Sequence, residues 1–160
     1  MNDKIKKALV KVGTLCAEND IPFMLTGTTS FKLLGLPVEP ADIDIITPSL
    51  TSRERELFSG LQKLTDDAIP NGYNQECYTL YLQGVKINVM PIGPEFETLE
   101  DDTIHKPLIV SVGSAEMAAS IPIAPISFSM RKKLSLKREK DRIFVLNLIK
   151  KLCELCDLQK

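Results

Sequence analysis

The sequence predicts a protein of the α/β (α+β) class, in which helices and strands alternate before a helical C-terminal part. Three observations predict this class. Apolar residues recur at helical spacing near the N-terminus, acidic and apolar residues alternate at strand spacing further on, and two β-rich runs flank a Gln-Gly pair. The 160 residues have ordinary globular composition and can bury a core. We expect one domain over residues 1–160, with a core of about 20–112 and a helical part of about 126–157.

The first predicted element is a helix over residues 3–18. Its apolar side chains recur in steps of four, three and four residues with lysines facing outward, which is typical of an amphipathic helix; they are Ile5, Leu9, Val12 and Cys16. Pro22 confirms that this helix has ended. Residues 23–26 then predict a short buried strand that runs into Gly27.

A helix, a strand and a second helix follow in turn. Residues 28–34 have the composition of a short helix, and residues 42–47 alternate acidic and apolar residues as a strand does. Thr51 and the glutamate three residues later resemble a capping box, which predicts a helix that runs to about residue 65. Residues 66–74 contain a proline and a glycine, and they predict a loop.

The rest of the chain predicts a hairpin, one more strand and two helices. The β-rich runs over residues 76–82 and 85–90 are joined by a Gln-Gly turn and form the hairpin. Residues 108–112 predict the further strand. The final third is helical over about residues 126–138 and 140–157.

Charge is unevenly distributed in a chain whose formal net charge is −1. Between Arg131 and Arg142, seven basic residues stand against two acidic ones, which indicates either attraction for polyanions such as triphosphate or RNA, or a solvated helix face. Lys133 and Lys137 are four residues apart, so we expect them to share one helix face.

Membrane and secretory signals are not recognisable in the sequence. No apolar run reaches the roughly 18 residues that span a bilayer, and the N-terminus lacks the apolar core of a signal peptide. Three of the four cysteines lie in apolar-periodic segments, where a free thiol behaves as a small hydrophobic group. We therefore expect a cytoplasmic protein with no disulfides and no membrane partner.

Asp42 and Asp44 are the candidates for chemistry. Two aspartates separated by one residue on a strand project from the same face, about 6.6 Å apart along the backbone. Their carboxylates can converge on Mg²⁺ or Mn²⁺, because such cations take a few carboxylates together with phosphate oxygens. A cation there would neutralise triphosphate charge, so we expect ATP or another NTP as the nucleotide.

The segment before this pair favours phosphate binding. A strand ends at Gly27, and the hydroxyl cluster Thr28, Thr29 and Ser30 opens the following helix. A glycine permits close approach of the backbone, and hydroxyls at a helix start bind phosphate oxygens. The alternative is a helix in which Thr28 or Thr29 is only an N-cap, which explains the hydroxyls but not the nearby acid pair.

Two separated segments resemble a known family. Residues 25–30, Leu-Thr-Gly-Thr-Thr-Ser, and residues 41–45, Ala-Asp-Ile-Asp-Ile, look like the Gly-Gly/Ser to Asp-x-Asp signature of the DNA polymerase beta-like nucleotidyltransferase superfamily, with Thr28 in place of the second glycine or serine. Residues 133–141, Lys-Leu-Ser-Leu-Lys-Arg-Glu-Lys-Asp, resemble the Lys-x-x-Ala-x-x-Arg-x-Lys-Asp helical motif of the branch that includes abortive-infection toxin nucleotidyltransferases.

The resemblance covers about residues 20–150 and implies a nucleotidyltransferase-like mixed sheet flanked by helices, with C-terminal helices. It also implies roles for particular residues. The implied catalytic residues are Asp42, Asp44 and Lys133. The implied nucleotide-binding residues are Gly27, Thr28, Thr29, Ser30 and Arg138.

The chain departs from the family at one position that matters. The family usually has a third carboxylate on a later strand, and the aligned segment offers Asn88 instead. An amide oxygen can ligate metal weakly, so Asn88 joins the aspartates as a candidate metal residue, but it cannot act as a general base. Alternation along the strand predicts that Asn88 points toward the aspartates while Ile87 and Val89 point into the core.

Three functions remain open on this sequence. The first is an enzyme that moves a nucleoside monophosphate from ATP or another NTP to a hydroxyl on RNA, protein or a small molecule. The second is a catalytically weakened nucleotide- or RNA-binding module that acts with a partner protein, for example in a toxin-antitoxin pair. The third is a folded domain whose ancestral site has decayed.

Overall fold

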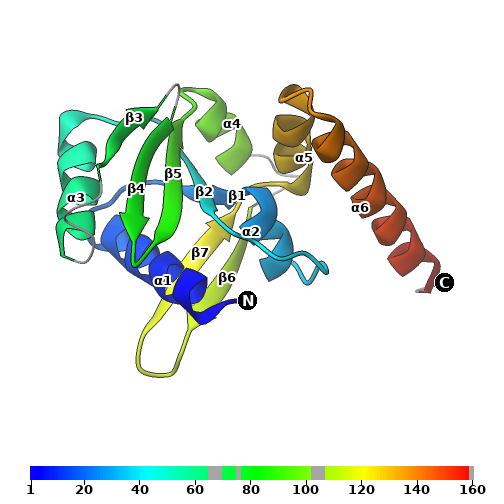
Figure 1. The fold of residues 1–160 in the computed structure, drawn as a ribbon, viewed down its shortest axis with the longest axis horizontal. Helices are drawn as coiled ribbons and strands as arrows, with labels where there is room; N and C mark the ends of the chain where they lie inside the picture. The colour runs from blue at the N-terminus through cyan, green and yellow to red at the C-terminus, as the bar shows by residue number, and fades with distance from the viewer. Residues whose placement is uncertain (65–69, 75–76, 102–106, 159–160) are drawn as a thin grey trace. The chain divides into compact units, whose positions relative to one another are not determined.

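A seven-stranded sheet forms the centre of the first part of the chain in the computed structural model, which describes residues 1–64, 70–74, 77–101 and 107–158 (Figure 1). The strands are β1 (Met24–Thr26), β2 (Ile43–Thr47), β3 (Gly72–Asn74), β4 (Cys77–Leu82), β5 (Val85–Pro91), β6 (Leu108–Gly113) and β7 (Ala118–Ile123). The chain divides into two compact units, Met1–Pro125, which holds this sheet, and Ile126–Lys160.

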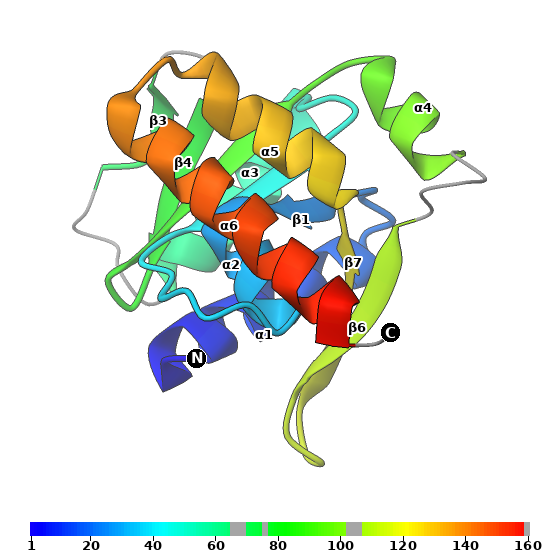
Figure 2. The same cartoon turned by 90° about the vertical axis from the view of Figure 1, so that its right-hand side faces the viewer.

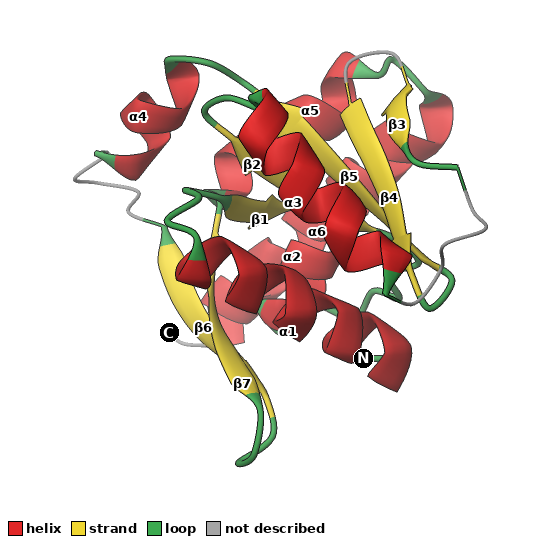
Figure 3. Ribbon diagram, turned by 90° about the vertical axis from the view of Figure 1, so that its left-hand side faces the viewer, coloured by secondary structure: helices red, strands yellow, loops and turns green. Residues whose placement is uncertain are grey.

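Helices accompany the sheet in the first unit and make up the second. The first unit contains α1 (Asp3–Glu18), α2 (Gly27–Leu33), α3 (Ser52–Lys63) and α4 (Glu95–Glu100), and the second contains α5 (Ile126–Ser135) and α6 (Glu139–Leu158). Figure 3 shows α1 and α3 over one face of the sheet. In the second unit α5 and α6 pack against each other (Figure 2). Within the described part of the chain, no helix is long and apolar enough to cross a membrane.

The sheet is mixed, and its centre is built from segments far apart in the sequence. The strand order is β3-β4-β5-β2-β1-β7-β6. β1 pairs antiparallel with β2 and parallel with β7, while β2 runs parallel to β5. The β4–β5 and β6–β7 pairs are antiparallel hairpins. This arrangement confirms the predicted class of a mixed sheet with flanking helices.

The core lies between the sheet and the apolar stripe of α1. Alternate residues of β2 and β5 point into it and are fully buried; they are Ile43, Ile45, Ile87 and Val89. The predicted stripe of α1 meets them with Leu9 and Val12, which are also fully buried. Gly13 lets α1 approach the sheet closely, because a methyl group there would lie 2.6 Å from Ile121 Cδ1 in β7. Asp44 of β2 points away from this core, on a face that also carries the fully buried Ile46.

Several predicted elements have the bounds or contacts that the sequence indicated. The first helix runs over Asp3–Glu18 as expected, and the Asn2 side chain caps it by accepting a hydrogen bond from the Lys4 amide. The capping box before α3 is present, with Thr51 and Glu54 satisfying each other's backbone amides.

Other predictions need correction. The loop predicted over residues 66–74 includes strand β3, and both α4 and β7 were not predicted. The predicted helix 126–138 ends at Ser135, and Lys137 has a φ of 54°, so Lys133 and Lys137 do not share a helix face. The first residue of the predicted hairpin, Glu76, lies outside the described residues.

Candidate functional site

The two predicted aspartates lie at the start of β2. Asp42 immediately precedes the strand and is exposed, whereas Asp44 is its second residue and is half-buried. Ile43 between them is fully buried. Because side chains alternate along a strand, Asp44 projects away from the face that carries Ile43 and Ile45. That the Asp42 carboxylate lies on the same face as Asp44 stays a prediction.

Gly27 brings its backbone against the Asp44 carboxylate. It begins α2 with a φ of 73°, a left-handed conformation that favours glycine. A Cβ added to Gly27 would lie 2.7 Å from Asp44 Oδ2. Any larger residue would therefore be strained and would crowd this carboxylate, so the glycine is required by the site's geometry.

Two of the three hydroxyl groups in the predicted cluster donate hydrogen bonds to backbone carbonyls. Thr29 Oγ1 donates a hydrogen bond to the Asp42 carbonyl over 2.6 Å, and Ser30 Oγ donates to the Gly27 carbonyl over the same distance. Thr29 and Ser30 are buried. Thr28 is half-buried, and within the described part of the chain its hydroxyl makes no side-chain hydrogen bond. Thr29 thus holds the backbone at Asp42, and Ser30 holds the turn at Gly27.

Asn88 faces Asp44, as the alternation along β5 predicts. Their Cα atoms are paired across the parallel β2–β5 ladder, and Asn88 Nδ2 donates to Asp44 Oδ1 over 2.8 Å. The Asn88 oxygen Oδ1 accepts from Thr79 Oγ1 of β4 over 3.0 Å. Thr79 was not predicted as a site residue.

The donor set fits a hard cation that keeps other oxygen ligands. Asp42 and Asp44 provide two carboxylates, and the described residues contain no group of three or more His, Cys, Asp or Glu side chains that could hold a metal ion. A closed structural zinc site needs four protein ligands, whereas Mg²⁺ takes one or two carboxylates with waters and substrate phosphates. The residues therefore suit Mg²⁺ or Mn²⁺ bound together with a phosphate-bearing ligand.

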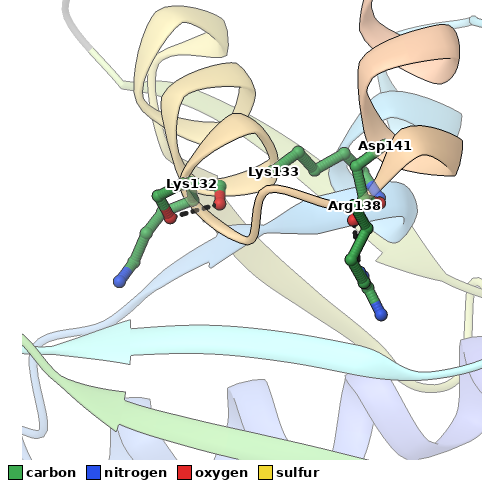
Figure 4. A network of polar contacts seen from close by, with 5 residues as sticks. Lys132, Lys133, Arg138 and Asp141 are labelled. Carbon is green, nitrogen blue, oxygen red and sulfur yellow. Dashed lines mark hydrogen bonds and ion pairs between the residues drawn. The ribbon is translucent and has the colours of Figure 1, made fainter.

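The second unit places Lys133 and Arg138 around one buried carboxylate. Figure 4 shows both side chains turned toward Asp141, while Lys132 points away from it. Lys133 Nζ lies 3.8 Å from Asp141 Oδ1, and Arg138 Nε donates to Asp141 Oδ2. The Asp141 side chain is only 5% exposed. The same Lys133 ammonium lies 4.6 Å from the centre of the Phe144 ring, a cation–π contact.

These contacts give the basic motif a structural role within its own unit. Asp141 lies in the first turn of α6 and Lys133 belongs to α5, so their ion pair ties the two helices, while Arg138 links the turn between them to the same carboxylate. The prediction that Lys133 and Arg138 contact a nucleotide stays a prediction. Sequence reasoning missed Asp141 as their partner, although it is the last residue of the motif.

No protein-family model and no curated protein matches the sequence. Solved structures resemble the fold. One is a Thermotoga maritima protein provisionally assigned as a nucleotidyltransferase, with 18% identity, a TM-score of 0.55, and 94% of this chain and 96% of that one covered. Another is an antigenic nucleotidyltransferase-like protein from Paracoccidioides brasiliensis, with 14% identity, a TM-score of 0.51, and 92% of this chain and 77% of that one covered.

A third structure, the complex of a CCA-adding enzyme with ATP, overlaps less well. It has 16% identity and a TM-score of 0.47, and the overlap covers 77% of this chain and 30% of that one, too little to carry an argument. The resemblance to the abortive-infection branch stays a prediction. The first two likenesses, at their low identities, show the fold, and the chain has a nucleotidyltransferase-like fold.

Proposed function

We propose that this chain is a nucleotidyltransferase-like protein that binds Mg²⁺ or Mn²⁺ together with ATP or another NTP at Asp42 and Asp44. The observation that supports this most is the seating of the Asp44 carboxylate against Gly27, where a side chain would collide with it, within a nucleotidyltransferase-like fold. An exposed second carboxylate, Asp42, stands two residues away, immediately before the strand. Two adjacent carboxylates repel each other, which favours a cation between them.

Each residue of the proposed site has a separate task. Asp42 and Asp44 would hold the cation, which would neutralise triphosphate charge and orient the reacting phosphate. Thr29 fixes the Asp42 backbone through its carbonyl, and Ser30 fixes the turn at Gly27. Thr28, whose hydroxyl is not engaged within the described residues, is the proposed phosphate contact.

Two functions share this binding step. In the first, the protein transfers a nucleoside monophosphate to a hydroxyl acceptor in the cytoplasm. That reaction needs a group to accept the acceptor's proton, and the amide of Asn88 cannot do so. The neutral Asn88 beside Asp44 therefore favours the second function, a nucleotide-binding module that acts with a partner and transfers slowly or not at all.

Calorimetry of ATP binding tests the shared step. We expect binding in Mg²⁺ that is lost in EDTA, because triphosphate alone meets the negative field of the aspartates. The double variant Asp42→Asn with Asp44→Asn should lose Mg²⁺-dependent binding. A matched control is Glu18→Gln with Asp20→Asn, which removes the same charge at the same spacing around the C-terminal end of α1 and should bind as the wild type does.

Two results would overturn the proposal. One is equal ATP affinity in EDTA and in Mg²⁺. The other is Mg²⁺-dependent binding that persists in the Asp42 and Asp44 double variant.

A further inference from the structure

A row of polar side chains crosses four neighbouring strands of the first unit at one level of the sheet. Thr26 of β1 is paired with Asp44 of β2, Asp44 with Asn88 of β5, and Asn88 with Thr79 of β4. Residues directly opposed across a ladder project to the same face. The row therefore lies on the sheet face that carries the candidate site, opposite the apolar core.

The hydrogen bonds along this row run in one direction. Thr79 Oγ1 donates to Asn88 Oδ1, and Asn88 Nδ2 donates to Asp44 Oδ1. An ionised carboxylate only accepts, so the amide must turn its NH₂ group toward Asp44 and its oxygen toward Thr79, whose hydroxyl has a proton to donate. The charge of Asp44 thus selects the amide orientation, and Thr79 secures it.

We propose that Thr79 is a positioning residue for the cation site, acting through Asn88 to hold the Asp44 carboxylate in one orientation with Oδ2 beside Gly27. This inference rests on the proposed function, since it concerns the same cation. In this arrangement Asn88 is a partner of the ligand Asp44. For Asn88 to ligate the metal itself, its amide would have to turn over and bring its oxygen against the Asp44 carboxylate.

Burial makes this positioning effective. Thr79 is 8% exposed and Asn88 is half-buried, so water does not readily replace either hydrogen bond. The terminal torsion of an aspartate is broad when nothing holds it. Partners that orient a metal ligand in other proteins change metal affinity by about tenfold to a hundredfold when they are removed.

A purely structural role for this hydrogen-bond chain makes a different prediction. If Thr79 only strengthens the sheet, its loss lowers the melting temperature and leaves the affinity for a cation unchanged. If it positions Asp44, the affinity falls as well. The two roles are separated by measuring Mn²⁺ binding and thermal unfolding on the same variants.

The chain offers a matched control for this experiment. Thr47 is also a buried threonine on a central strand, but its Oγ1 has no hydrogen-bond partner within the described residues. Thr79→Val and Thr47→Val therefore make the same change, hydroxyl to methyl, in a linked and an unlinked position. Thr79→Ser keeps the hydroxyl and serves as the rescue variant.

We expect calorimetry with Mn²⁺ alone to show an affinity about tenfold or more below wild type for Thr79→Val. Thr79→Ser and Thr47→Val should stay within twofold of wild type. Thermal unfolding in EDTA, followed by circular dichroism, reports stability separately. If Thr79→Val does not fold, Thr79→Ala measured at low temperature replaces it.

The outcomes distinguish this inference from the proposed function. Wild-type protein that binds neither Mn²⁺ nor Mg²⁺-ATP overturns both. Wild-type protein that binds Mn²⁺ while the Thr79→Val variant matches it within twofold overturns the positioning role alone. An equal loss of affinity in Thr47→Val would also overturn it, because the effect would then be general to buried threonines.

Discussion

The two segments that resemble the nucleotidyltransferase family differ in how their charges are compensated. In the segment around β2, Asp42 is exposed and Asp44 accepts a hydrogen bond from the neutral amide of Asn88. In the segment that joins α5 to α6, Lys133 and Arg138 converge on Asp141, a buried carboxylate in the first turn of α6. The Asp44 carboxylate thus accepts from a neutral amide, whereas the Asp141 carboxylate lies between two cations.

This difference separates two kinds of motif residue. Cations grouped around a buried counter-ion stabilise their own unit whether or not a ligand is present. Two carboxylates separated by one residue gain from a cation that comes from outside the chain. The acid pair is therefore the better candidate for a binding site, and the basic motif must show its ligand contact separately.

The largest expected effect comes from restoring charge at Asn88. Asn88→Asp replaces the donor to Asp44 with a second carboxylate, so the variant should be less stable than wild type in EDTA and should regain stability in Mg²⁺. If the missing base is all that limits transfer, the rate should rise by about a hundredfold to ten-thousandfold. The transfer rate is measured with labelled ATP and a pool of cellular RNA and protein.

Asn88→Leu is the control for Asn88→Asp, because it removes the same donor without adding charge. Robust transfer by the wild-type protein would show that another acid fills the role. Equal stability of Asn88→Asp with and without Mg²⁺ would contradict the placement of a cation beside Asp44.

A smaller effect is expected in the basic motif. Asp141→Asn leaves Lys133 and Arg138 without their buried counter-ion and should lower the free energy of unfolding by about 2 kcal/mol, measured by urea denaturation. The control is Glu139→Gln in the same helical turn. Glu139 pairs with Arg142 in an exposed ion pair, and the hydrogen bond from Arg142 lowers the pKa of Glu139.

The exposed pair of Glu139 and Arg142 should contribute far less to the free energy of unfolding than Asp141 does. Its contribution is present above the ordinary pKa of glutamate, is lost as the pH falls through the lowered pKa, and is screened by salt. Similar destabilisation by Asp141→Asn and Glu139→Gln at neutral pH would mean that burial of Asp141 does not set its importance.

The smallest effect is expected on the affinity for Mg²⁺-ATP. If Lys133 contacts the nucleotide, Lys133→Ala should weaken Mg²⁺-ATP binding by up to about fivefold, since a partly exposed charge contributes up to about 1 kcal/mol. The loss should shrink in high salt. Lys132→Ala removes the same charge from a side chain that points away from Asp141, and it should bind normally (Figure 4). Lower stability with unchanged affinity in Lys133→Ala would assign this lysine to Asp141 alone.

The elements that were predicted correctly are those stabilised by interactions between residues close in the sequence. The stripe of α1 and the capping box at Thr51 are short-range signals, and both are present in the structure. Strand β7 was missed because it contains Pro122 and small residues, and because its pairing with β1 joins segments that are distant in the sequence. The six-residue helix α4 was not predicted because the acidic composition of its segment obscured the pattern. Its apolar residues Phe96 and Leu99 are nevertheless spaced for one buried helical face.

The site, like the fold, could be predicted in part from local patterns. Alternation along β5 placed Asn88 toward Asp44, but it does not show which end of the amide faces the carboxylate. Thr79 could have been found from the hairpin, because Gln83 and Gly84 form a two-residue turn with φ values of 50° and 80°, which sets Thr79 opposite Asn88. The burial of Asp141 depends on three-dimensional packing, which charge patterns in the sequence do not report.

The position of β1 at the centre of the sheet has a consequence for how the protein folds. β1 is three residues long, and only Leu25 pairs with β7, at Ile123, with one further bond from the Ala124 amide. During synthesis β1, which ends at Thr26, is made well before its parallel partner β7, which begins at Ala118. Such distant pairing closes slowly, and until then the edge of β1 is open to wrong partners. Helix α1, which contacts both β5 and the β6–β7 hairpin, is the element that can keep β1 and β7 together once the hairpin has formed.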